Sequence, residues 1–252
     1  MTGRQREPGP PSTHGDGIAP TVLSPLPAAA QGPQDGCILN AVLGPYRLRS
    51  LLGQGGMAMV YEASSPTGLL VALKVLQESP FLPAGMLERF HREAEAAKRL
   101  GSHPNIVTVH ETGQAGRDHY IAMELVPGGQ TLACRIRRGP LPVAEALQLA
   151  IKIADALAFA HRQGIVHRDI KPGNILLSAA DEPLLSDFGL ARIEMDPSRS
   201  LTVSSLTGGT PRYMAPEQAA SLRAASHLSD QYSFGVLLYE MLTVQPPYRI
   251  DS

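Results

Sequence analysis

The most informative stretch of the chain is His167-Arg168-Asp169-Ile170-Lys171-Pro172-Gly173-Asn174. Apolar runs flank it, at Ile165-Val166 and at 175–177, and this pattern predicts a short strand, a polar loop and a second short strand. In the loop, Asp169 can accept a proton from a hydroxyl and Lys171 can neutralise a phosphate. Asn174 can offer a carbonyl oxygen to a hard cation such as Mg²⁺. The stretch therefore predicts a site that handles phosphate groups.

A second carboxylate follows on another tight turn, Asp187-Phe188-Gly189, thirteen residues after Asn174. Two oxygen ligands for a metal, one base and one lysine together suit the transfer of a phosphoryl group. The two stretches resemble the catalytic loop and metal-binding turn of eukaryotic-type protein kinases, most closely the bacterial Ser/Thr branch. In this form of the loop, a lysine stands two positions after the catalytic aspartate.

The resemblance implies an α+β, two-lobed kinase fold and an ATP-dependent Ser/Thr protein kinase that uses Mg²⁺. Asp169 would orient and deprotonate the substrate hydroxyl, and Lys171 would stabilise the transferring group. Asn174 and Asp187 would bind magnesium. A small antiparallel sheet with one helix would occupy residues 43–125, and a mainly helical lobe would occupy residues 126–252.

A glycine-rich turn precedes these motifs, and it reads Leu52-Gly53-Gln54-Gly55-Gly56-Met57-Ala58-Met59-Val60. Glycines at this point let backbone N–H groups approach phosphate oxygens. Alone, such a motif is often only a hairpin turn. It resembles the kinase glycine-rich loop, with Ala58 at the third glycine position, which should stiffen the loop slightly. The resemblance implies that nucleotide contacts come from Leu52, Gly53, Gln54, Gly55, Gly56 and Val60.

Lys74 stands in the apolar run 71–75, where a lysine is usually a strand residue with its head in water. The resemblance implies instead that Lys74 binds the α- and β-phosphates of ATP. Residues 85–100 predict a helix of mixed charge, which a solvated surface helix would also explain. The kinase pattern makes Glu93 the partner of Lys74, although Glu88 and Glu95 compete in principle.

The adenine site follows from the same resemblance. Two strands are expected, at Ile106–Val109 and His119–Leu125, because apolar residues alternate there. The second runs into a segment that resembles the hinge between kinase lobes. Met123 would stand beside the adenine, and the backbones of Glu124 and Val126 would hydrogen-bond its edge. Val60, Ala72 and Leu176 would sandwich the ring.

Two further helices are expected in the large lobe, at 142–163 and 232–242. The first has a predicted core face made of Val143, Leu147, Ala150, Ile151, Ala154, Leu157 and Ala158, because these repeat at helical spacing. Asp230, which enters the second helix, would cap it, and the kinase pattern gives it the task of holding the catalytic loop. His103 is expected to be a structural loop residue, because no Cys or His partner has ligand spacing.

The segment from Asp187 to Glu217 resembles a kinase activation segment and contains seven Ser and Thr residues between 198 and 210. A loop of this composition is usually only polar. Beside Arg168, however, a phosphate in this segment could pair with the guanidinium and order the loop. Thr202 and Ser204 are the expected sites of autophosphorylation, which leaves a homodimer open. Thr210 would contact the catalytic loop instead.

Composition and charge argue against several classes of protein. A net charge of −1 argues against nucleic-acid binding. Cys37 and Cys134 lack zinc or disulfide spacing, so a reduced, cytoplasmic setting is expected. No apolar run reaches the about 18 residues of a membrane span, although a full-length form could be anchored beyond this chain. Thirteen of the first 42 residues are Gly or Pro, which predicts a disordered tail. A docking or phosphorylation tail is the alternative.

The chain stops at Ser252, where kinases of this type continue with more helices. The expectation is thus a catalytic domain truncated at its C-terminal end, with an exposed apolar patch near 232–242 and with Glu217 lacking an identifiable partner. Two other functions stay open. The chain could be an inactive kinase fragment or scaffold that binds nucleotide or partners, or a small-molecule phosphotransferase with a kinase-like core.

Overall fold

The computed structural model describes residues 41–54, 58–77, 82, 85–188, 211–221 and 224–248, without the side chains of Arg89, Glu93 and Pro211. The expected tail, up to residue 40, lies outside the described residues. So do Gly55, Gly56 and the segment 189–210 that carries Thr202, Ser204 and Thr210. The predictions for these residues therefore stay predictions.

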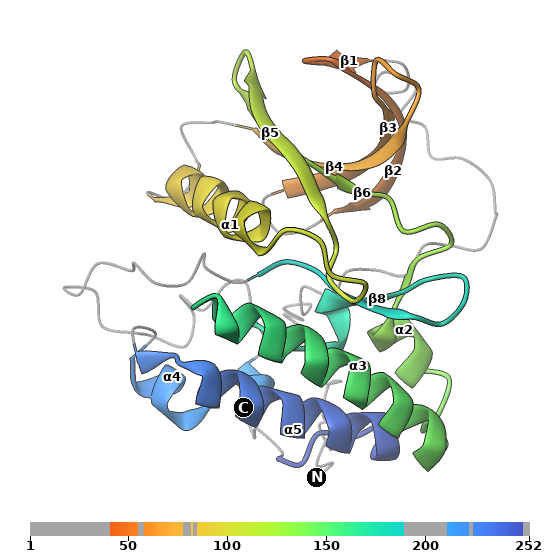
Figure 1. Cartoon of the computed structure of the whole chain (residues 1–252), viewed down its shortest axis with the longest axis vertical. Coiled ribbons are helices and arrows are strands. Elements are labelled where there is room, and N and C mark those ends of the chain that lie inside the picture. Colours follow the sequence, from red (N-terminus) through yellow and green to blue (C-terminus); the bar gives the residue numbers. More distant parts are fainter. Residues whose placement is uncertain are drawn as a thin grey trace, which may run out of the picture.

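The first lobe is built on a six-stranded antiparallel sheet, as the kinase resemblance predicts (Figure 1). Its order is β1-β2-β3-β4-β6-β5. The strands are β1 Val42–Leu43, β2 Tyr46–Gln54, β3 Ala58–Ser64, β4 Leu70–Gln77, β5 Val109–Ala115 and β6 Asp118–Glu124. Helix α1, Met86–Leu100, lies beside the sheet. The strands carry buried apolar residues, such as Val71, Leu73 and Val75 on β4, which fit a half-buried pleated surface.

The two faces of this sheet carry different residues because successive side chains alternate across a strand. On one face, Tyr46 and Tyr120 pack edge to face with ring centroids 5.6 Å apart, within a cluster that also holds Leu73 and Ala122. On the opposite face, α1 packs on the sheet through Leu76, Phe90, Ala94 and Ile121. Five partly buried residues extend this second cluster, and Ala96 and Leu100, further along α1, belong to the core cluster of the second lobe.

Gly113 on β5 lies against the ring of Tyr120, its partner across the ladder. A Cβ atom at Gly113 would stand 2.2 Å from the Tyr120 hydroxyl oxygen. We therefore expect Gly113→Ala to lower the free energy of unfolding by about 1–3 kcal/mol, as overpacking does. Gly235, in the interior of helix α5 (His227–Thr243), has no heavy atom within 4 Å of such a Cβ.

Gly235→Ala is the matched substitution, and it should raise stability by about 0.5–1 kcal/mol, because alanine favours the helix over glycine. Urea unfolding of the two variants checks the expected loss of stability in Gly113→Ala and the expected gain in Gly235→Ala. A neutral or stabilising Gly113→Ala would contradict the close packing of Tyr120.

One expected strand is wrong. Residues 106–109 were expected to form a strand, but β5 begins only at Val109. Ile106 instead makes an isolated parallel bridge to Leu185, and the Val107 N–H donates to the Leu185 carbonyl at 2.9 Å. These apolar residues bind a strand of the second lobe, so their burial comes from the contact between lobes. The similar expectation for 165–166 also fails, because no strand is formed there.

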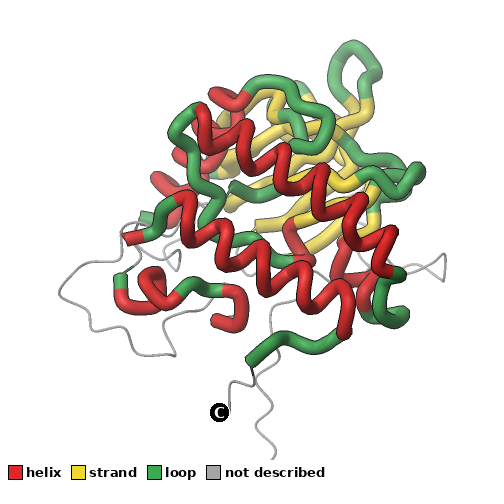
Figure 2. Tube along the Cα trace, turned by 60° about the horizontal axis from the view of Figure 1, so that its bottom comes forward, coloured by secondary structure: helices red, strands yellow, loops and turns green. Residues whose placement is uncertain are grey.

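The second lobe is mainly helical (Figures 1 and 2). Its helices are α2 Leu132–Ile136, α3 Val143–Arg162, α4 Pro216–Ala220 and α5. A three-stranded sheet, ordered β7-β8-β9, lies between α3 and the first lobe; its strands are Gln130–Thr131, Ile175–Leu177 and Pro183–Leu185. The Leu141 N–H donates to the Met241 carbonyl at 2.8 Å, so the start of α3 meets the end of α5.

The predicted core face of α3 is wrong for most of its members. Val143, Leu147 and Ile151 are 64%, 49% and 69% exposed. The buried residues of α3 are Ala146, Leu149, Ala150, Ile153, Ala156, Leu157 and Ala160. Apolar residues surround much of this helix, so two of its faces have the apolar spacing of a core face. The face that is rich in alanine is the buried one, because small side chains let α3 approach α5 more closely than large ones would. On α5, Tyr239 and Leu242 are 46% and 37% exposed, within the expected apolar patch.

Candidate active site

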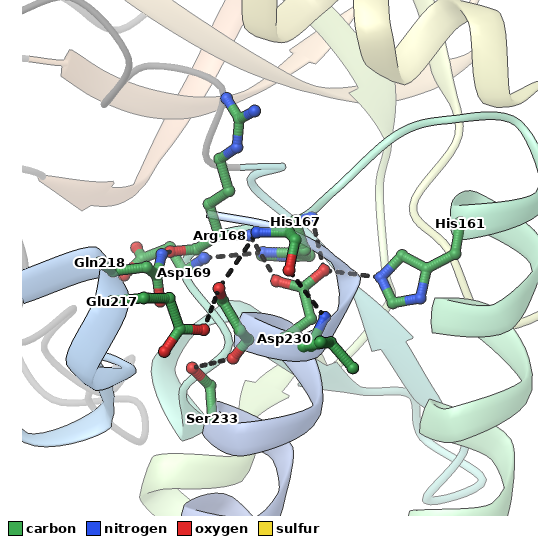
Figure 3. A network of polar contacts seen from close by, with 11 residues as sticks. His161, His167, Arg168, Asp169, Glu217, Gln218, Asp230 and Ser233 are labelled. Carbon is green, nitrogen blue, oxygen red and sulfur yellow. Dashed lines mark hydrogen bonds and ion pairs between the residues drawn. The ribbon is translucent and has the colours of Figure 1, made fainter. Parts of the chain in front are cut away.

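The loop 167–174 is anchored from below by Asp230, in the first turn of α5 (Figure 3). Its carboxylate is fully buried and accepts hydrogen bonds from the backbone N–H groups of His167, at 2.8 Å, and Arg168, at 2.7 Å. His161 Nε2, on the last turn of α3, lies 2.7 Å from the same carboxylate. A buried carboxylate needs such partners, and these fix the backbone before Asp169. The holding role expected for Asp230 agrees with this geometry, but the expected capping role is wrong, because Ser226 is the N-cap of α5 and its side chain accepts from the Leu228 N–H.

His167 ties the loop to the strand that leads to Asp187. The ring is fully buried, its Nε2 lies 3.0 Å from the Ser186 carbonyl, and its Nδ1 accepts from the Asp169 N–H at 3.3 Å. Burial lowers the pKa of His167, so the imidazole is neutral near pH 7. The Phe188 ring packs on it at 4.6 Å. The two rings are therefore core residues.

Asp169, Lys171 and Asn174 meet at one point. Lys171 Nζ lies 2.8 Å from Asp169 Oδ2, and Asn174 Nδ2 lies 2.9 Å from the same oxygen. Asn174 Nδ2 also donates to the Asp169 backbone carbonyl at 2.8 Å. The short 3₁₀ turn Pro172–Asn174, begun by a proline, carries Asn174 back toward Asp169. The carboxylate is thus oriented by a cation and an amide, as a positioned base requires.

Asp187 lies beside this group because β8 and β9 pair. The Ser186 N–H and hydroxyl both donate to the Asn174 carbonyl, at 2.9 and 3.1 Å. Asp187 then adopts a positive φ of 57°, which is uncommon for a residue other than glycine. Its Oδ1 accepts from Lys74 Nζ at 2.8 Å. Lys74 of the first lobe and Asp187 of the second therefore meet in one ion pair.

The oxygen atoms at this point fit a hard cation. Both hydrogens of the Asn174 amide nitrogen are directed to Asp169, which leaves the amide oxygen for a metal. Asp187 contributes a carboxylate, and oxygen ligands are those that Mg²⁺ prefers. These two residues are the ones that the sequence predicts as metal ligands.

The predicted adenine contacts gather between the lobes. Val60 pairs with Lys74, and Ala72 pairs with Met123. Cross-strand partners share a face, so these four side chains lie on the face toward the second lobe. Met123 and Leu176 pack on a cluster of Val107, Val126 and Leu184. Leu52, Gly53 and Gln54 end β2, where Gly53 pairs with Val60.

The backbone conformation of Arg168 and the burial of its side chain could not be predicted from the sequence. Its φ is 68°, and its Nε and Nη1 atoms are buried with no hydrogen-bond partner among the residues that the structure describes. Burial lowers the pKa of this guanidinium. In Figure 3 the side chain extends away from the network around Asp230. Buried donors without a partner are costly, and an anion would satisfy them.

Glu217 does have a partner, contrary to expectation. The Ser229 hydroxyl donates to Glu217 Oε1 at 2.6 Å, and this bond lowers the pKa of Glu217. The next residue, Gln218, donates to the Arg168 carbonyl at 3.2 Å and accepts from the Ala215 N–H at 3.2 Å. The roles of Ser229, Gln218 and His161 in supporting the site were not predicted from the sequence. Of the three, only Gln218 could have been suspected from the sequence, because it directly follows Glu217.

Several predicted residues cannot be placed at this site. Gly55 and Gly56 lie outside the described part of the chain, and so does the side chain of Glu93, although its backbone belongs to α1. Its competitors Glu88 and Glu95 are exposed on α1. His103 Nδ1 accepts from the Asn105 N–H at 3.1 Å, and its Nε2 lies 3.4 Å from Asp155. These contacts agree with the structural role expected for His103.

A family model and several known proteins are similar to this chain. The family model of the protein kinase domain matches residues 46–252. A probable serine/threonine-protein kinase of Streptomyces coelicolor is 42% identical over 215 residues, which is 83% of this chain and 32% of that protein. The serine/threonine-protein kinase PknD of Mycobacterium tuberculosis is 40% identical and covers 85% of this chain and 32% of its own length.

Among solved structures, the PknI kinase domain of Mycobacterium tuberculosis superposes with a TM-score of 0.66 at 29% identity, over 84% of this chain and 78% of that one. The chain spans about a third of the length of the curated relatives named above. Within the described ranges, no helix is both long and apolar enough to pass through a membrane.

Proposed function

The chain belongs to the protein kinase family, and from this premise we propose that it is an ATP-dependent protein kinase that phosphorylates Ser and Thr hydroxyls of proteins. The observation that carries the proposal is the meeting of Asp169, Lys171 and Asn174 at one carboxylate oxygen, on a loop anchored by the buried Asp230. Its relatives are named serine/threonine-protein kinases, which supports this choice of hydroxyl.

In the proposed reaction, Asp169 orients the substrate hydroxyl and takes its proton as the oxygen attacks the γ-phosphorus. The bond between that phosphorus and the bridging oxygen of ADP breaks, and ADP carries away the electron pair. Lys171 moves its positive charge toward the transferring group as charge develops there. Asn174 and Asp187 would hold Mg²⁺, which neutralises the phosphates. Lys74 would bind the α- and β-phosphates, next to Asp187.

The adenine would lie against Val60, Ala72, Met123 and Leu176. The Glu124 N–H already donates to the Thr108 carbonyl at 2.8 Å, and the Val126 carbonyl accepts from the Gly129 N–H at 3.0 Å. We therefore expect the base to use the Glu124 carbonyl and the Val126 N–H. Glycines 53, 55 and 56 would cover the phosphates together with Leu52 and Gln54.

Autophosphorylation would supply the anion that Arg168 lacks. We expect incubation with Mg-ATP to place phosphate on Thr202 or Ser204, because a phosphate there could pair with the buried guanidinium. Phosphopeptide mapping by mass spectrometry checks this. Phosphate found only in residues 1–42 would contradict it.

Arg168→Gln is the variant that isolates the pairing. It should leave phosphate incorporation detectable, but the phosphorylated variant should lose the rise in activity that phosphorylation gives the unaltered chain. Arg162→Gln, on the exposed end of α3, is the matched control and should behave like the unaltered chain. Transfer between two copies would make the initial rate of incorporation depend on the square of the protein concentration.

A further inference from the structure

Two histidines face each other where α1 meets the sheet. Nε2 of His91, on α1, lies 3.2 Å from Nδ1 of His119, on β6. The rings stand edge to face, with centroids 5.0 Å apart and planes at 86°. His119 is only 3% exposed, and its other ring nitrogen, Nε2, is buried with no partner among the described residues. Among the described residues, the contact with His91 is therefore the polar interaction made by the buried His119 ring.

The pair links α1 to the sheet near the middle of the helix. The N-terminus of α1, capped by Gly85, has no side-chain hydrogen bond. The cluster between α1 and the sheet has four buried residues and five partly buried ones, whereas Ala96 and Leu100, toward the end of α1, belong to the core cluster of the second lobe. Near that end, Lys98 Nζ lies 3.1 Å from the Thr112 hydroxyl at an exposed position. The His91–His119 contact is thus a polar link between α1 and β6 that precedes the end held by the second lobe, and Glu93 stands two positions after His91 on this helix.

The number of protons on the two imidazole rings decides whether the His91–His119 hydrogen bond can form. With one proton between the two facing nitrogens, one ring donates and the other accepts. If both rings are protonated, each facing nitrogen is a donor, and two cations meet with these nitrogens 3.2 Å apart. His119 is nearly buried, so water cannot screen that repulsion well. The doubly protonated pair must separate.

Burial and the neighbouring histidine favour separation in acid. Burial and then His119 lower the pKa of His91, while Glu88 and Glu95, on the same helix, act to raise it, and the net direction is downward. The ladder neighbours of His119 are Leu76 on β4 and Gln114 on β5, and neither carries a charge. A lowered histidine pKa means that protons bind better to the separated state. Separation therefore becomes more favourable as the pH falls below about 6.5.

We propose that His91 and His119 are a positioning pair that holds α1 on β6 at neutral pH and releases it in acid. Release moves the backbone that carries Glu93 away from Lys74, so phosphoryl transfer slows; this consequence rests on the proposed kinase activity. The release itself does not depend on that activity.

Hydrogen exchange measures the release directly. The protection of the α1 amides is compared with that of the α3 amides in the same sample, at pH 7.5 and at pH 5.5, so that the intrinsic pH dependence of exchange cancels. In the unaltered chain the α1-to-α3 ratio should fall several-fold and up to about tenfold, because pH 5.5 lies about one unit below the ordinary histidine pKa of about 6.5. In His91→Gln, whose amide can still bond to His119 but does not titrate, it should change less than twofold.

His110→Gln is the matched control, because His110 is exposed on β5 of the same sheet; its ratio should fall as in the unaltered chain. A constant ratio in the unaltered chain, or an equal fall in His91→Gln, overturns the proposal.

The pH dependence of kcat separates this inference from the proposed function. We expect the unaltered chain to lose more activity between pH 7.5 and 5.5 than His91→Gln does. Equal losses overturn the link to catalysis. Absence of transfer in every chain at every pH would instead overturn the kinase proposal, and the exchange ratio would still decide whether the pair releases α1.

Discussion

Asp187→Asn should lower the rate of phosphoryl transfer by about a thousandfold, because a bound metal ion contributes several kcal/mol of charge stabilisation in the transition state. The substitution removes the negative charge that faces Lys74 at 2.8 Å and weakens the predicted magnesium site. The fold should survive, because Asp187 has a φ of 57° and asparagine tolerates this left-handed conformation as well as aspartate does.

The matched control is Asp181→Asn in the turn between β8 and β9. Asp181 has nearly the same φ, 58°, but is exposed. Both variants make the same chemical change in the same backbone conformation, so a difference in activity reports the charge at Asp187. Steady-state rates over a range of Mg²⁺ concentrations provide the measurement. Normal turnover by Asp187→Asn would rule out the metal assignment.

Asp230→Asn should be the most destabilising of the substitutions considered, at about 2–5 kcal/mol, because it leaves buried donors unpaired. The carboxylate accepts from the N–H groups of His167 and Arg168 and contacts His161. An amide group in its place offers one acceptor oxygen and turns an NH₂ group toward donors. Transfer activity should fall as well, since the backbone that carries Asp169 loses its anchor.

Asp155→Asn is the control for Asp230→Asn. Asp155 also contacts a histidine, His103, at 3.4 Å, but its side chain is 66% exposed, so we expect a change within about 0.5 kcal/mol. Chemical unfolding, followed by circular dichroism, compares the two. If both variants unfold at the same denaturant concentration as the unaltered chain, Asp230 does not anchor the loop.

The chemistry of the site could be predicted because it depends on residue types at fixed spacing in one short loop. Asp169, Lys171 and Asn174 lie within six positions, and the turn at Pro172 brings them together. The partners of that loop were harder to find. Ser229 and His161 are ordinary polar residues on helices. Only the packing of α5 against α4 brings Ser229 to Glu217, and only the packing of α3 against α5 brings His161 to Asp230.

The positions of α1 and α3 were predicted well, whereas α5 begins at His227 and not at the expected 232, and the buried face of α3 was predicted wrongly. Residues 142–163 closely bracket α3, yet Val143 and Ile151, expected in the core, are exposed. Periodicity identifies an apolar stripe, but it cannot rank two stripes on a helix that is apolar nearly all round. Likewise, Ile106 and Val107 are apolar because they contact β9 across the lobes, which a local pattern cannot reveal.

The most direct test of the account is transfer of the labelled γ-phosphate of Mg-ATP to the chain itself and to a generic protein substrate, with Asp169→Asn as the control. We predict transfer to Ser and Thr hydroxyls by the unaltered chain, and a rate lower by about a hundredfold to ten-thousandfold in Asp169→Asn, the range that general-base catalysis supplies. A folded chain whose melting temperature rises on adding Mg-ATP, but which transfers no phosphate, would contradict the kinase proposal and leave a nucleotide-binding protein.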